Sequence, residues 1–295
     1  MHRYALTIFL GVLAALVVVA PAAADAPIVQ TVTKKVPVRE GTVTESKAFC
    51  PRNMAAVSGA VVSHPAGSTL RRSLPSGARS WRFAFGGYIG ATKRSATVML
   101  RCVGLNVPDA AGKVQLNVNT VSRTLSTGAI GRAERTVSCR RGYVPTDWGF
   151  NIPPPNTTQN VLPAEELQVF KALAGSRGYS FGIENLGAGD QGAGLRVRCL
   201  QRTVAGRAGL SHSWRIRRVR NSDGIRGGNR VVGHSCRAGH LSVGRGQSID
   251  PAGDVVFRRS FPRRTRSARW LFDNAGGRDT VTTQIQCLSM GTDFR

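Results

Sequence analysis

Val98-Met99-Leu100-Arg101-Cys102-Val103 decides the fold, because the pattern of this stretch occurs three times along the chain. Its counterparts are residues 195–200 (LRVRCL) and 283–288 (TQIQCL), and in each a cysteine follows an alternation of apolar and polar residues. A period of two residues places successive side chains on opposite faces of a β-strand. The sequence therefore predicts a mainly β protein with the same strand in each of three repeats.

The six cysteines form three pairs with regular spacing. The first cysteines are Cys50, Cys139 and Cys236, the second are Cys102, Cys199 and Cys287, and the separations are 52, 60 and 51 residues. This rhythm predicts an internal repeat of about 90 residues with one disulfide inside each copy. Closing loops of that length would contribute about 4 kcal/mol each to units whose cores are small.

Two further motifs recur between the paired cysteines. An aromatic residue opens a second alternating run at Trp81, Tyr179 and Trp270, which we take as corresponding positions. Just before it, residues 70–75 (LRRSLP) recur as 257–262 (FRRSFP) and more loosely as 170–173 (FKAL). The repeats therefore contain several corresponding strands and not only a shared pair of cysteines.

The organisation predicted from these repeats is a leader followed by three tandem domains. The leader covers residues 1–24, and the domains cover residues 25–107, 108–204 and 205–295, divided in Gly/Ala/Pro-rich stretches. Each domain is predicted to be a small disulfide-closed β-sandwich with the strand of the second cysteine at its centre. The aromatic residue comes too late after the first cysteine for the tryptophan of an immunoglobulin domain, so that topology is not predicted.

Residues 163–175 resist the β interpretation. Pro163 near the start, Glu165 and Glu166 in the first turn, Lys171 near the end and Gly175 after it are signals of a helix. The corresponding segments of the other repeats resemble strands. A short helix is therefore predicted in the second domain only.

The amino terminus predicts secretion. Arg3 precedes the apolar run at residues 8–20, and Pro21 and Ala22-Ala23-Ala24 then provide the small residues that a signal peptidase accepts, with cleavage after Ala24. A membrane anchor is the alternative, but this run is short for a bilayer span, and no later segment is long and apolar enough. We expect an extracellular protein that either is free or associates with the cell wall, in a compartment where disulfides persist.

The chain is strongly basic. It has 41 Lys and Arg against 16 Asp and Glu, a formal net charge of +25, and arginine predominates. Arginine pairs with phosphate and carboxylate in a bidentate manner, so anionic envelope polymer, acidic polysaccharide or, non-specifically, nucleic acid is the predicted partner. Biased composition is the alternative explanation. The candidate polyanion-binding residues are Arg71, Arg72, Arg215, Arg217, Arg218, Arg220, Arg258, Arg259, Arg263, Arg264 and Arg266.

Motifs that would indicate catalysis, a cofactor or a metal are weak. Residues 187–192 (GAGDQG) match a dinucleotide-loop pattern but join two strands, which favours a hairpin. His234 and His240 flank Cys236, whose predicted partner is Cys287, while His64 and His212 are isolated. No serine lies in a nucleophile-elbow pattern. We therefore predict no cofactor, no metal and no enzymatic activity.

The stretch from Cys50-Pro51 through Trp81 to Arg101-Cys102-Val103 resembles repeat domains of secreted actinobacterial proteins of unassigned activity. The second domain departs from the pattern, with Arg140 after its first cysteine and Tyr179 in place of the tryptophan. The resemblance implies tandem β domains and no particular active site.

Three functions agree with these features. The first is a non-catalytic extracellular or envelope-associated protein whose basic domains contact anionic polymers. The second is a structural or adhesive protein that recognises a protein or glycan through its loops. The third is a secreted hydrolase or inhibitor, whose site would lie in the loop between Trp148 and Pro163 and would require a deep pocket with convergent polar groups. The oligomeric state stays open.

Overall fold

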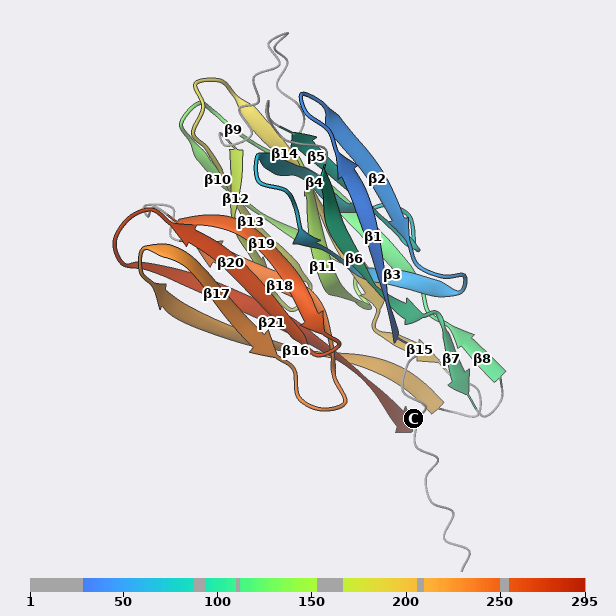
Figure 1. Cartoon of the computed structure of the whole chain (residues 1–295). Helices are drawn as coiled ribbons and strands as arrows, with labels where there is room; N and C mark the ends of the chain where they lie inside the picture. Colours follow the sequence, from blue (N-terminus) through green and yellow to red (C-terminus); the bar gives the residue numbers. More distant parts are fainter. Residues whose placement is uncertain are drawn as a thin grey trace, which may run out of the picture.

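The computed structural model describes residues 29–87, 94–109, 112–152, 167–205, 210–249 and 255–294, and within them it contains strands and turns but no helix (Figure 1). The predicted leader at 1–24 and the segment 153–166 lie outside the described residues. No described helix is long and apolar enough to cross a membrane. The prediction of an all-β fold is confirmed.

The first six strands form one structural unit, unit 1, which consists of two three-stranded antiparallel sheets ordered β1-β6-β3 and β2-β5-β4. Valines, phenylalanines and Trp81 pack between them. The strands are β1 (Val29–Val38), β2 (Val43–Phe49), β3 (Met54–Ser63), β4 (Ser68–Pro75), β5 (Ser80–Gly87) and β6 (Arg94–Gly104).

The same topology occurs twice more, as β9-β14-β11 with β10-β13-β12, and as β16-β21-β18 with β17-β20-β19. The second unit contains β9 (Val118–Thr127), β10 (Arg132–Ser138), β11 (Tyr143–Asn151), β12 (Leu167–Ala174), β13 (Gly178–Asn185) and β14 (Gln191–Gln201). The third contains β16 (Leu210–Ile225), β17 (Gly228–Ser235), β18 (Leu241–Ile249), β19 (Val255–Arg264), β20 (Ser267–Asn274) and β21 (Asp279–Phe294). The short strands between units are β7 (Asn106–Asp109), β8 (Gly112–Gln115) and β15 (Thr203–Ala205).

Each unit contains one of the three predicted disulfides. They join Cys50 to Cys102, Cys139 to Cys199 and Cys236 to Cys287, with Cα–Cα distances of 5.7, 5.8 and 5.5 Å. The second cysteines lie on β6, β14 and β21, which are the central strands of their three-stranded sheets, as predicted. The domain boundaries near residues 107 and 204 stay predictions.

Two details of the sequence interpretation were wrong. The predicted helix at 163–175 is strand β12 from Leu167 onward, while residues 163–166 lie outside the described part. Pairing of β12 with β13 and β18, and burial of apolar side chains along it, outweigh its local helix signals. Trp270 does not correspond to Trp81, because strand register aligns Trp81 with Ala268 and places Trp270 at the position of Phe83.

The three units contact one another in a closed ring. The residue before each second cysteine reaches back to another unit: Arg101 Nη1 donates to the Thr265 carbonyl (2.6 Å), Arg198 Nη2 donates to the Gly77 carbonyl (2.6 Å), and Gln286 donates to the Tyr179 hydroxyl. These contacts join unit 1 to unit 3, unit 2 to unit 1, and unit 3 to unit 2. The corresponding strands β3, β11 and β18 also share an apolar core that includes Val57, Val144 and Val243.

Two of the three seams between units are closed by strand pairing. We call the sheets β2-β5-β4, β10-β13-β12 and β17-β20-β19 the outer sheets of the three units. At the first seam β4 pairs with β11, and at the second β12 pairs with β18, so the outer sheets of units 1 and 2 each continue into the next unit. At the third seam β19 lies beside β3, but no ladder joins them among the described residues. We call this last one the open seam.

Glycines explain the difference between the seams. Gly149 on β11 and Gly246 on β18 occupy corresponding positions, and a Cβ at either would overlap the neighbouring backbone, at 2.6 Å from Leu74 Cα and 2.6 Å from the Ala172 carbonyl oxygen respectively. The corresponding residue of β3 is Ala60, and β3 has an additional register shift between Val61 and Ser63. Glycine lets the backbones of two units approach closely at the first two seams. At the open seam β3 has no glycine at this position, and the register shift makes its edge irregular.

Replacing Gly149 with alanine is therefore expected to lower the free energy of unfolding by about 1–3 kcal/mol, because the added methyl group forces β11 away from β4. Denaturant unfolding would measure the loss. Gly224→Ala is the matched control, since a Cβ at this strand position meets nothing within 4 Å. Equal stabilities of the two variants would contradict the explanation.

Candidate functional site

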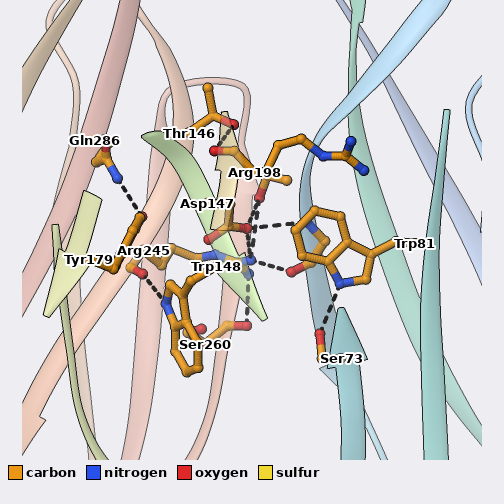
Figure 2. Close-up of polar contacts among 12 residues, drawn as sticks. Ser73, Trp81, Thr146, Asp147, Trp148, Tyr179, Arg198, Arg245, Ser260 and Gln286 are labelled. Carbon is orange, nitrogen blue, oxygen red and sulfur yellow. Dashed lines mark hydrogen bonds and ion pairs between the residues drawn. The ribbon is translucent and has the colours of Figure 1, made fainter. Parts of the chain in front are cut away.

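A buried polar layer lies where the three units meet, formed by Ser58 of unit 1, Asp147 of unit 2 and Arg245 of unit 3. Figure 2 shows Asp147 and Arg245 in this layer. Arg245 Nη2 lies 2.9 Å from Asp147 Oδ2, and the Ser58 hydroxyl donates to the same oxygen at 2.6 Å. The Gly59 amide adds a third donor at 3.2 Å. Asp147 is only 1% exposed and Arg245 only 5%, so this ion pair is almost completely removed from water.

Other contacts extend from this layer into all three units. Arg245 donates through Nη1 to the Ser260 carbonyl at 3.1 Å and through Nη2 to the Gly59 carbonyl. The indole Nε1 of Trp148 donates to the Arg245 carbonyl at 2.6 Å. These hydrogen bonds therefore link strands of all three units.

Burial governs the ionisation of this layer. It raises the pKa of Asp147 above the ordinary value of 3.8, against the opposing effects of Arg245 and the Ser58 hydroxyl. Burial, together with the nearby charge of Arg245, lowers the pKa of Arg101 to about 10. Arg101 thus lies beside the layer as a second guanidinium group near a single carboxylate, in a place where charge is poorly solvated.

A cleft of about 450 Å³ opens above the layer and is lined by all three units. Residues of β3, β4, β11, β12, β18 and β19 contribute to it, with Asp147 and Arg245 among them. The walls contain both polar and apolar side chains, and the larger apolar ones are Leu70, Trp148, Phe150, Ile152, Leu167 and Phe257. This volume lies in the range of small-molecule sites.

The polar groups that line the cleft can be compared with known catalytic arrangements. Among the described lining residues Asp147 is the one acidic residue, so these residues provide no pair of carboxylates such as glycoside hydrolysis uses. The polar partners of the Asp147 side chain are Ser58, Arg245 and backbone amides, and the imidazole of His64 instead contacts the Ser68 hydroxyl at 3.1 Å. The hypothesis of a secreted hydrolase or inhibitor required a deep pocket with convergent polar groups in the loop after Trp148. A pocket is present there, but its convergent groups form an ion pair.

The predicted arginines of β16 lie on the surface. Arg215, Arg217, Arg218 and Arg220 are all exposed, and Arg218 donates to the Gly175 carbonyl at 2.5 Å. Among described residues, none of Arg217, Arg218 and Arg220 has an ion pair with a carboxylate.

The sequence analysis named two arginines of β4, Arg71 and Arg72, as candidate polyanion-binding residues. Arg71 is only 3% exposed, so its side chain does not lie on the surface as that prediction expected. Its bulge position on β4 turns the side chain inward, whereas Arg72 lies at a groove of about 620 Å³ across the first seam. We call this groove the first arginine groove. Its basic residues are Arg72, Arg82, Arg123 and Arg196.

One carboxylate serves two of these arginines. Glu45 pairs with Arg72 and, at 2.9 Å, with Arg82. Arg196 donates to the Pro75 carbonyl at 3.1 Å, and its pKa is lowered by partial burial and then by the charges of Arg82 and Arg72. Sequence reasoning missed Arg82, Arg123 and Arg196, because only the pairing of β4 with β11 brings them together.

The remaining predicted arginines lie on or after β19. Arg263 and Arg266 are exposed and line a groove of about 420 Å³ with Arg269, which we call the second arginine groove. The described residues that line it include no carboxylate. Arg259 instead lines the cleft, and the side chains of Arg258 and Arg264 lie outside the described part.

The weak sequence motifs have structural explanations. Residues 187–192 join β13 to β14, so the hairpin prediction is confirmed. His234 Nε2 lies 2.6 Å from the Thr283 hydroxyl, its ring packs edge-on against Trp270, and burial lowers its pKa. His240 contacts the Ala238 carbonyl.

No model of a known protein family matches the chain, and comparison with curated proteins found no match.

Proposed function

We propose that this is a secreted, non-catalytic extracellular protein that binds an anionic polymer through its arginine grooves. The observation that carries the proposal is the first arginine groove, where four arginines line one concave surface and Glu45 pairs with only two of them, Arg72 and Arg82, among the described residues. Such an excess of positive charge attracts anions.

The geometry of the groove favours phosphate, sulfate or carboxylate groups on a polymer. Guanidinium groups present planar pairs of donors that suit these anions. Partial burial and then the charges of Arg82 and Arg72 lower the pKa of Arg196, and a bound anion would offset the repulsion among these three arginines. The second arginine groove offers a further cationic surface on another unit, so one polymer could engage both grooves and gain avidity.

The disulfides support the proposed location. Three bridges, one in each unit, suit an oxidising compartment outside the cytoplasm. The predicted leader is consistent with that compartment.

The test compares binding of the purified disulfide-bonded protein to an acidic polysaccharide, to cell-wall material and to DNA across a salt series. The triple variant Arg82→Gln, Arg123→Gln, Arg196→Gln is expected to bind at least tenfold more weakly at low salt, with a slope of log K against log salt smaller by roughly two to three. The matched control, Arg52→Gln, Arg94→Gln, Arg237→Gln, removes the same charge from exposed positions outside both grooves.

Equal loss in the two triple variants would mean that total charge, and not the groove, determines binding. Binding that does not change with salt would contradict the proposal and favour recognition of a protein or glycan through loops.

A further inference from the structure

One basic residue recurs on the strands β4, β12 and β19 of the three outer sheets. In each sheet it shares a cross-strand row with a residue of the strand on the far side of the middle strand, which is β2, β10 or β17. In unit 1 the cross-strand row is Arg72, Ala84 and Glu45, and Arg72 is paired with Glu45. In unit 2 the row is Lys171, Gly182 and Glu134, with Lys171 Nζ 2.5 Å from the Glu134 carboxylate. A cation and a carboxylate therefore compensate each other in both rows.

Unit 3 has the cation without the carboxylate. The row there is Arg259, Leu271 and Val231, so an apolar residue stands where the other units have glutamate. Arg259 has no ion pair among the described residues, its Nε is buried without a hydrogen-bond partner, and its guanidinium carbon lies 5.4 Å from the centre of the Phe261 ring. No carboxylate in the described part of the chain therefore compensates the charge of Arg259.

Arg259 lies on the open seam and lines the cleft. The other charged residues that line the cleft, Asp147 and Arg245, already neutralise each other at 2.9 Å. Among the described lining residues, Arg259 is therefore the charge without a counter-ion; it is half-buried, whereas the pair beneath is almost fully buried. A cationic ligand would meet no free carboxylate among the described lining residues.

We propose that the cleft binds an amphipathic molecule with an anionic head group. The head pairs with Arg259, and the apolar part lies against Phe150, Ile152, Leu167, Val169 and Phe257. A partly desolvated arginine forms a charge-assisted hydrogen bond with a carboxylate or phosphate, while the walls favour burial of a hydrocarbon chain. This site is separate from the arginine grooves and does not depend on the proposed polymer binding.

The first experiment measures the dissociation constant of decanoate by calorimetry and tests its place by tryptophan quenching. Decanoate that carries bromine on its chain is expected to quench Trp148, which lines the cleft, more strongly than Trp81, Trp214 and Trp270, which are fully buried and do not line it. Decyltrimethylammonium, with the same chain and the opposite charge, is expected to bind at least tenfold more weakly. Decyl phosphate distinguishes a phosphate head from a carboxylate head.

Three variants test the role of Arg259. Arg259→Gln is expected to weaken decanoate binding roughly tenfold to a hundredfold, the usual effect of losing a charge-assisted hydrogen bond. Val231→Glu supplies the carboxylate that the other units have, and it should weaken binding similarly; Val231 is 49% exposed, so the fold should tolerate the change. Arg72→Gln, at the corresponding position outside the cleft, should leave the dissociation constant unchanged.

Unchanged affinity in Arg259→Gln would overturn the proposal, as would equal binding of the cationic amphiphile or absence of decanoate binding to the unmodified protein. Equal weakening in Arg72→Gln and Arg259→Gln would also overturn it, since binding would then follow total charge. Polymer binding by the first arginine groove is expected to persist in Arg259→Gln.

Discussion

Replacing Arg245 with methionine is expected to lower the free energy of unfolding at neutral pH by about 3–5 kcal/mol, the cost typical of leaving one partner of a buried ion pair alone. Asp147 would keep the Ser58 hydroxyl and the Gly59 amide as donors but would lose its counter-ion. Denaturant unfolding, monitored by tryptophan fluorescence, measures the change. The exposed control Arg132→Met, which removes an ion pair with Glu184, is expected to cost less than about 1 kcal/mol.

The loss should depend on pH in a defined direction. The pKa of Asp147 is raised in the folded protein, so the folded state binds the proton more tightly than the unfolded chain does. Stability from this group is therefore present at low pH and is lost as pH rises from about 3.8 through the folded pKa. Without Arg245 the folded pKa rises further, and the deficit of the variant should be larger at pH 8 than at pH 4.

A double variant separates the charge from the packing. Asp147→Asn combined with Arg245→Met leaves no charge in the polar layer, and it should recover a large part of the loss at pH 8. If Arg245→Met alone loses less than 1 kcal/mol and shows no dependence on pH, the ion pair does not hold the units together.

The second large effect concerns the disulfide with the widest separation. Replacing Cys139 and Cys199 with alanine is expected to lower the free energy of unfolding by about 4 kcal/mol, because the bridge spans 60 residues and restricts the unfolded chain. The midpoint of guanidinium unfolding would show the loss directly.

The disulfide of the third unit provides a matched comparison. It spans 51 residues, and the loss predicted by chain entropy varies with the logarithm of loop length, so its removal should cost nearly the same amount. A large difference between the two variants would show that packing or strain, and not loop closure, determines the contribution. A loss under 1 kcal/mol in both would contradict the entropic account.

Much of the fold could be predicted because its signals are local and repeated. The alternation around Cys102, Cys199 and Cys287 predicted the central strands, and the cysteine spacing predicted the bridges. The error at β12 arose because most of the helix signals lie just outside it, at residues 163–166 and Gly175, while the hydrogen-bond partners of Leu167–Ala174 lie on β13 and β18.

The candidate site could not be predicted in the same way. Ser58, Asp147 and Arg245 lie far apart in sequence, and each belongs to a different unit. One signal was available, since Asp147 and Arg245 are charged residues within stretches that become almost completely buried strands. Glu45, Glu134 and Val231 all lie five residues before the first cysteine of their unit, but only strand register shows that they share cross-strand rows with Arg72, Lys171 and Arg259.

The open seam joins the first unit of the ring to the last. Units 1 and 2, and units 2 and 3, follow each other directly along the chain, so their contacts can form while the protein is being synthesised. The contacts of β19 with β3, and of Arg245 with Ser58 and Asp147, require the third unit. The cleft, whose lining comes from all three units, therefore requires β18 and β19, and a product truncated before β18 would lack the site.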